Sequence, residues 1–153
     1  MKRFIIILTI LLSIILAYSQ TAFSELAKSN VDEGNYDKQL DKGFEYLNSN
    51  KVDSCYEILY ECLLYYNHNI VKKDRNIPAI GLQHLYEIKE ELDSAIYYAR
   101  IYLESLEANS EFSNIEIANT WNSIGHYQFK LGKVKDAIYS IREAVKFLEE
   151  KIK

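Results

Sequence analysis

The chain is poor in the residues that make turns. It has one proline and five glycines among 153 residues, too few for the many tight turns of an all-β domain. Basic residues are also in the minority: 18 lysines and arginines stand against 22 acidic residues and give a formal net charge of -4. This balance provides no electrostatic footprint for nucleic acid. With 48% hydrophobic residues, the composition favours a single all-α domain of long helices.

Long apolar runs are confined to the start of the chain. Two basic residues precede the run FIIILTILLSIILA at residues 4–17, and Ala17 and Ser19 supply small residues at its end. This pattern is typical of a secretory signal peptide over residues 1–19. The alternative is an uncleaved membrane anchor, for which the run is short, because a span needs about twenty residues. We therefore expect an exported chain, periplasmic or secreted, that touches a membrane only if residues 4–17 are retained.

Cysteine is scarce as well, with Cys55 and Cys62 alone. An exported chain can hold disulfides, but the segment KVDSCYEILYECLLYY has apolar residues at helical spacing and no helix breaker. The step from Cys55 to Cys62 would rise about 10.5 Å along a helix, whereas bridged Cα atoms lie within about 7 Å. A metal site would need more ligands, and only His68 stands nearby. We predict two free thiols buried in one helix.

An internal repeat explains the cysteines as packing residues. The apolar stripe of this segment returns forty and then forty-two residues further on, at the same seven places. The three stripes are Val52, Cys55, Tyr56, Leu59, Cys62, Leu63 and Tyr66; Leu92, Ala95, Ile96, Ala99, Tyr102, Leu103 and Leu106; and Val134, Ala137, Ile138, Ile141, Ala144, Val145 and Leu148. Cys55 stands where the other stripes have Ala95 and Ala137, and Cys62 where the third has Ala144. Because a free cysteine behaves as a small hydrophobe, both let helices approach closely.

A second helix precedes each stripe, and the last pair resembles the tetratricopeptide repeat (TPR). Trp121 and Gly125 match its Trp-x-x-Leu-Gly opening, and Gly132 matches its glycine between the helices. The chain departs from the family at Gln128, where tyrosine is usual, and at Gln83, where the second pair lacks the glycine. The packing residues implied by the resemblance are Gly43, Cys55, Cys62, Ala95, Trp121, Gly125, Gly132, Ala137 and Ala144.

The resemblance implies a fold and a way of binding. The fold is an all-α solenoid of about three helical-hairpin repeats, six helices in residues 35–153, after a leader segment or short helix at residues 20–34. In this family the first helices of the pairs line a concave groove that holds a protein or peptide. In register, the groove residues are Phe44, His84, Asn122, His126 and Phe129. Phe44, His84 and His126 share one column, read either as a pH-responsive ligand contact or as ordinary surface side chains.

Local signals place two helix starts. The segment SNIE at residues 113–116 is a capping box, and Pro78 suits the first turn of a helix. The last stripe has no further helix after it to cover its apolar face. We therefore expect that face to contact a partner or a second copy, which would make a homo-oligomer.

No motif of a nucleophile, phosphate loop, zinc protease or calcium loop occurs in the sequence. The acidic residues are scattered along polar faces and are read as solvated helix surface. We predict an exported, non-catalytic scaffold, without metal or other cofactor, that binds a protein or peptide in its groove. The alternative is a sensory repeat module of a short or truncated, membrane-associated signalling protein.

Overall fold

The computed structural model describes residues 31–69, 75–108 and 112–149. These residues form six α-helices and no strand, which confirms the all-α prediction. The helices are α2 (Tyr36–Asn48), α3 (Val52–Asn69), α4 (Ile77–Ile88), α5 (Leu92–Glu107), α6 (Asn114–Lys130) and α7 (Val134–Glu149). The predicted signal peptide and residues 20–30 of the leader lie outside the described residues. No helix within the described ranges is long and apolar enough to cross a membrane.

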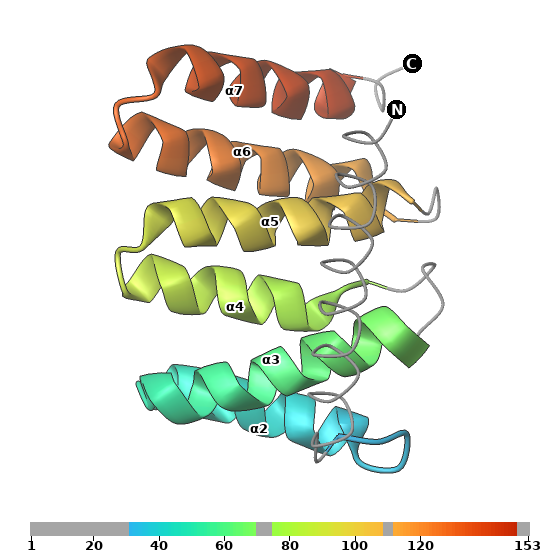
Figure 1. Cartoon of the computed structure of the whole chain (residues 1–153). Coiled ribbons are helices and arrows are strands. Elements are labelled where there is room, and N and C mark those ends of the chain that lie inside the picture. The colour runs from blue at the N-terminus through green and yellow to red at the C-terminus, as the bar shows by residue number, and fades with distance from the viewer. Residues whose placement is uncertain (1–30, 70–74, 109–111, 150–153) are drawn as a thin grey trace, which may run out of the picture.

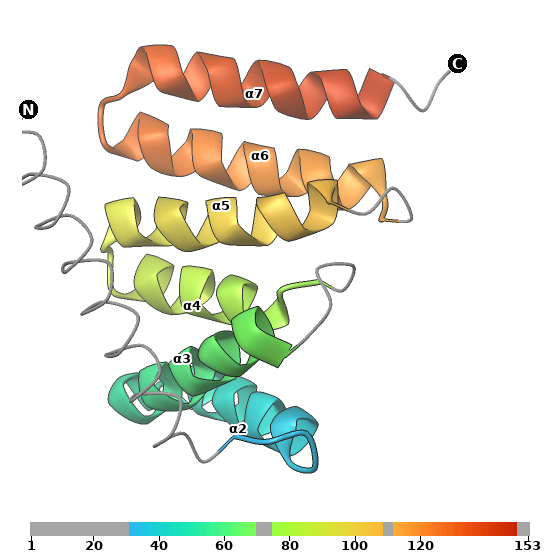
Figure 2. The ribbon, with the colours of Figure 1, turned by 45° about the vertical axis from the view of Figure 1, so that its right-hand side comes forward.

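The helices lie in a row in chain order, each running back alongside the one before it (Figure 1). Every helix packs on the next, and α2 also contacts α4. The row is twisted: in the turned view the α2–α3 pair crosses the other helices at an angle (Figure 2). Among the described residues, α7 contacts α6 and no other helix. One long side of α7 therefore has no neighbour among the described helices.

The predicted stripes coincide with the second helix of each pair. Val52, Leu92 and Val134, the first residues of the three stripes, are also the first residues of α3, α5 and α7. Pro78 lies in the first turn of α4, where the missing backbone N–H is not needed. The periodicity of apolar residues thus marked where these three helices lie in the chain.

The start of α6 confirms a cap but corrects its form. Ser113 is the N-cap, and its hydroxyl accepts a hydrogen bond of 3.2 Å from the backbone N–H of Ile115. Glu116, expected to complete a capping box, instead pairs its carboxylate with the guanidinium of Arg75 at 3.1 Å. That ion pair joins the beginnings of α4 and α6, a long-range contact that local spacing could not reveal.

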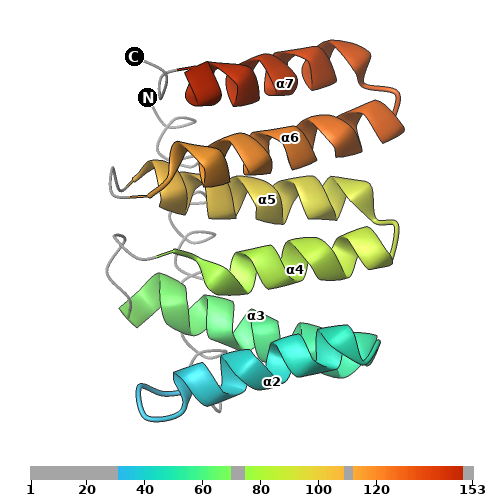
Figure 3. The same cartoon turned by 180° about the vertical axis from the view of Figure 1, so that it is seen from behind.

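The three turns within the helix pairs share one backbone geometry. Asn50, Glu90 and Gly132 have positive φ angles of 57°, 58° and 73°, and they are separated by the same forty and forty-two residues as the stripes. The hydrogen bonds that close the turns are Lys51 N–H to Tyr46 O, Glu91 N–H to Tyr86 O and Lys133 N–H to Gln128 O, each 2.9 Å. This is the Schellman arrangement of a helix end. All three turns lie at one edge of the row, and the view from behind shows the same (Figure 3).

Gly132 belongs to this turn and not, as the sequence suggested, to the packing residues. No atom lies within 4 Å of the place that a Cβ on Gly132 would take. Its value is conformational, because glycine adopts a positive φ without steric cost.

The other small residues do pack. Cys55 and Cys62 are free thiols with no exposed surface, as predicted. Ala95, Ala137 and Ala144 are buried at the equivalent places of α5 and α7. Burial raises the pKa of Cys55 to about 11 and that of Cys62 to about 12, in Cys62 with a smaller contribution from nearby Glu61. The cysteines are therefore protonated, apolar space fillers.

Glycines mark the points of closest helix approach. A Cβ on Gly43 would lie 2.6 Å from Cδ2 of Leu59, and one on Gly81 would lie 2.8 Å from its Cδ1. Leu59 of α3 is thus held between a glycine of α2 and a glycine of α4, and none of its surface is exposed. A Cβ on Gly125 of α6 would lie 2.9 Å from Cδ1 of Ile141 on α7 in the same way.

Polar and aromatic contacts also join α6 to α7. The Ser140 hydroxyl donates a hydrogen bond of 2.7 Å to the side-chain oxygen of Gln128, and both residues are buried. Gln128, the departure from the family pattern, therefore serves as an internal acceptor. Trp121 stacks edge-on against Tyr139, with ring centroids 6.0 Å apart, while its indole N–H is buried without a hydrogen-bond partner.

Candidate interaction groove

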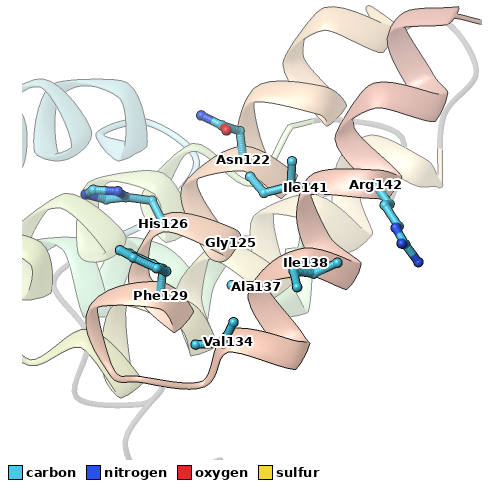
Figure 4. A pocket seen from close by; sticks show the side chains of 9 residues that line it. All are labelled: Asn122, Gly125, His126, Phe129, Val134, Ala137, Ile138, Ile141 and Arg142. Atoms are coloured by element: carbon cyan, nitrogen blue, oxygen red, sulfur yellow. The ribbon is translucent and has the colours of Figure 1, made fainter.

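A groove of about 490 Å³ lies between α6 and α7 at the end of the row. We name it the end groove. Its lining residues are Asn122, Gly125, His126, Phe129, Val134, Ala137, Ile138, Ile141 and Arg142 (Figure 4). Asn122, His126 and Phe129 are three of the five groove residues predicted from the sequence. The structure brings them together with side chains of α7.

The shape of the end groove follows from the sizes of its side chains. Its lining includes Gly125, without a side chain, and Ala137, with a single methyl group. Larger apolar side chains stand at its sides: Phe129 is 64% exposed and Ile138 50% exposed. An apolar hollow with raised apolar sides is the usual form of a binding surface.

The apolar surface of the end groove continues along α7 to Val145 and Leu148. We call it the outer ridge, and its residues are Val134, Ile138, Ile141, Val145 and Leu148, which are 39–50% exposed. The small residues of the same helix, Ala137, Ser140 and Ala144, are buried. The last stripe is thus only half covered, in agreement with the prediction that the preceding helix cannot shield it alone.

The end groove is the third of three equivalent grooves. Leu59 and Ala99 take the place of Ile141 in the two earlier helix pairs, and neither has exposed surface. The difference arises because α4 packs on the α2–α3 pair and α6 packs on α5. Ile141 is 39% exposed since no described helix follows α7. Where the first two grooves are filled by the next helix, the end groove is open.

Arg142 is the one lining residue of the end groove with a formal charge, and that charge is positive. Asn122, His126 and Arg142 are its polar lining residues, and no carboxylate is among them. Arg142 is exposed, so its guanidinium is available to a ligand. A bound molecule would therefore gain from hydrogen-bond acceptors or carboxylates near this helix.

The structure separates the predicted column of Phe44, His84 and His126. Phe44 is partly buried and packs against the core, and its Cζ would lie 3.1 Å from a Cβ on Gly81. It is a packing residue between α2 and α4, because α4 covers the first groove. His84 stays exposed on α4, with Nδ1 3.6 Å from a carboxylate oxygen of Glu87. His126 alone lines the end groove.

A buried tyrosine joins α4 to α6 and was missed from the sequence. The Gln83 amide donates a hydrogen bond of 3.1 Å to the Tyr127 hydroxyl, which donates one of 2.7 Å to the Glu87 carboxylate. Burial, and then the bond to Glu87, raises the pKa of this hydroxyl. The available signal was Gln83, which stands where the other two helix pairs have Gly43 and Gly125. These contacts fix α6, and with it His126 and Phe129, relative to the rest of the row.

The chain matches no protein-family model, no curated protein and no solved structure. In the part of the chain that the structure describes, no three His, Cys, Asp or Glu side chains gather in a way that could hold a metal ion. What the end groove can do therefore has to be derived from its own residues: it offers apolar contact, a cation and hydrogen-bond donors.

Proposed function

We propose that the chain is an exported, non-catalytic scaffold of TPR-like helical hairpins that binds a protein or peptide partner in the end groove. The observation that carries this proposal is the open third groove. Two equivalent grooves in the same molecule are filled by a helix, and the third leaves Ile141 and its neighbours exposed. Exposed apolar surface that would be buried in a regular series is a docking surface.

The repeat interpretation is supported by backbone geometry as well as by the stripes. Three turns with the same left-handed residue and the same closing hydrogen bond recur at the repeat spacing. Each turn is followed by a helix that buries small residues of its stripe, and in α3 and α5 the next helix of the row covers that stripe further. In such an array every unit packs mainly on its neighbours, so the last unit has an unfilled face.

Binding in the end groove would draw on apolar burial. The residues of the outer ridge are already about half covered, so completing their burial is worth about 1 kcal/mol each. Asn122, His126 and Arg142 would orient the partner. These are the ingredients of a protein-recognition surface, an apolar centre with a polar rim.

Site-specific photo-crosslinking in cells that produce the full chain tests this proposal. A photoreactive residue placed at Phe129, in the end groove, is compared with one at Tyr97, which is equally exposed on α5. We expect a defined protein adduct from position 129 alone, and we expect Ile138→Glu to abolish it. Similar adducts from both positions, or none from position 129, would show that the groove is not an interaction site.

A further inference from the structure

The three equivalent grooves differ in their side chains, and the end groove matches the first. The corresponding residues are Gly43, Leu47 and Leu59 in the first groove, Gln83, Glu87 and Ala99 in the second, and Gly125, Phe129 and Ile141 in the end groove. The second groove is polar and receives the tyrosine hydroxyl of α6. The first and the end groove both combine a glycine with two large apolar residues.

The helix that fills the first groove shows what such a groove needs. Gly81 of α4 faces Leu59, so that Leu59 has glycine on both sides. In the equivalent place α6 carries Ser123, and the position equivalent to Leu59 is held by the smaller Ala99. One turn after Gly81, α4 carries Leu85, which is 1% exposed in the same core cluster as Leu59. A large residue in the groove thus goes with glycine in the filling helix.

We infer that the end groove takes an amphipathic α-helix of another protein, with glycine facing Ile141, a leucine-sized residue one turn later and acidic residues at its flank. This inference rests on the proposed function and names the class of partner. Such a helix would continue the series of interfaces made by α4 and α6. The acidic flank follows from Arg142, the one charged lining residue, because no carboxylate among the lining residues neutralises it.

A second copy of the chain fits the end groove less well. The outer ridge of α7 consists of Val, Ile and Leu only, whereas the small residues of α7 are buried against α6. Two copies joined through α7 would place branched side chains against Ile141 where the first groove has Gly81. They would also bring two exposed Arg142 side chains into one interface, which like charges oppose.

A peptide pair tests the inference with the chain purified as the cell processes it. The probe is a fluorescent peptide with the sequence of residues 76–91, NIPAIGLQHLYEIKEE, which contains α4. The control peptide carries Gly81→Leu. Leucine favours helix formation over glycine, so weaker binding of the control cannot come from lost helicity. By fluorescence anisotropy we expect the control to bind at least about tenfold more weakly, because its leucine would overlap Ile141.

Variants of the groove residues test the same contact with the peptide unchanged. Ile141→Ala should remove the preference for the glycine peptide, since the space for the leucine is then available. Arg142→Glu should weaken the probe by about two- to fivefold, as expected for an exposed ion pair. The matched control is Arg100→Glu, at the equivalent exposed position of α5, which should leave the affinity unchanged.

The possible outcomes separate this inference from the proposed function. Equal affinity of the two peptides, or no binding of either while the adduct at position 129 persists, overturns the helix inference and leaves the scaffold function standing. A dimer in sedimentation that Ile138→Glu dissociates identifies a second copy as the occupant and overturns it too. If neither the adduct at position 129 nor a peptide complex forms, both the scaffold function and the helix inference are rejected.

Discussion

Leu59 and Ile141 occupy equivalent positions in different surroundings. Leu59 is enclosed by Gly43 and Gly81 and has no exposed surface, whereas Ile141 meets Gly125 on one side and the end groove on the other. The freedom of one side chain to move therefore decides how much a neighbouring methyl group costs. This difference can be measured.

We expect Gly81→Ala to destabilise the fold by about 1–3 kcal/mol and Gly125→Ala to be close to neutral. Alanine in a helix gains up to about 1 kcal/mol over glycine. At position 81 its Cβ would press on Leu59, which cannot move without overpacking the core. At position 125 the side chain of Ile141 can turn toward the open groove. The backbone oxygen of Ala137, 3.3 Å from the added Cβ, leaves a small cost that the helix propensity of alanine offsets. Urea denaturation gives both values, and equal losses would contradict the difference in enclosure.

The two cysteines should make the free energy of unfolding fall as the pH becomes alkaline. Burial raises the pKa of Cys55 to about 11 and of Cys62 to about 12, from an ordinary value of 9.0. The folded state therefore holds these protons more tightly than the unfolded state. Their contribution to stability is complete below about pH 9 and is lost as the pH rises through 11 and 12.

We expect the double variant Cys55→Ala, Cys62→Ala to lose less stability between pH 9 and 11 than the wild type. Alanine already occupies the equivalent places at Ala95, Ala137 and Ala144, so the variant should fold. The free energy of unfolding in urea at several pH values supplies the slopes. The buried tyrosines act in the same direction in both proteins, so the difference between the slopes isolates the thiols. If the free energy of unfolding fell equally with pH in both proteins, the raised pKa values of the two thiols would be refuted.

At the scale of the helix pair, the turn geometry is kept while its residue changes. Asn50, Glu90 and Gly132 all take the left-handed conformation. Glycine does so freely and asparagine at modest cost, but glutamate pays the steric penalty of its Cβ, about 1–2 kcal/mol. The α4–α5 turn is therefore strained at Glu90, and the surrounding helices hold it in place.

Glu90→Gly should stabilise the protein by about 0.5–1 kcal/mol, because relief of the strain outweighs the added freedom of the unfolded chain. Gly132→Ala should cost about 1 kcal/mol for the reverse reason. Lys89→Gly is the control: Lys89 has an ordinary helical φ of -75°, so glycine there can only destabilise. Thermal or urea denaturation reports all three, and a loss at position 90 would contradict the strain.

Helix positions could be predicted because their signal is repeated along the chain. The seven-place stripes fixed the starts of α3, α5 and α7, and the segment SNIE marked the start of α6. The left-handed turn at Glu90 could not be predicted, since glutamate carries no signal of that geometry. The predicted local role of Glu116 in a capping box was wrong, because its ion pair with Arg75 is not a local feature.

The candidate site was predicted in part. Asn122, His126 and Phe129 were found from the register of the first helices and do line one groove. The sequence could not show that α4 would cover Phe44, since that depends on how far the glycines let the helices approach. It also placed the groove along the row, whereas the open groove lies at its end and takes five of its nine lining residues from α7.

At the scale of the whole molecule, the helices differ in how many neighbours support them. In the described residues α4 and α5 have a helix on either side, whereas α7 has α6 alone. In a row of units that contact only their neighbours, opening begins at an unsupported end.

We expect backbone amides of α7 to exchange with solvent faster than those of α4 and α5, which should open only with the whole fold. Hydrogen exchange followed by mass spectrometry resolves the helices. Addition of the 76–91 peptide should slow exchange in α7 alone, because the bound helix supplies the missing neighbour. Uniform protection along the row would mean that the six helices open together.

The connections at the two edges of the row differ in whether their length is constant. Equivalent residues of the first and second pairs are forty apart at every place compared. The turns at one edge of the row (Figure 1) also keep one backbone geometry in all three pairs. The two additional residues before the third pair fall after Leu106 and before Ser123, where the chain passes from α5 to α6 at the opposite edge. The turns at one edge thus have a constant length, whereas the connection at the other edge tolerates insertions. A label or fused module belongs at the tolerant edge, where it lengthens a connection without moving a helix.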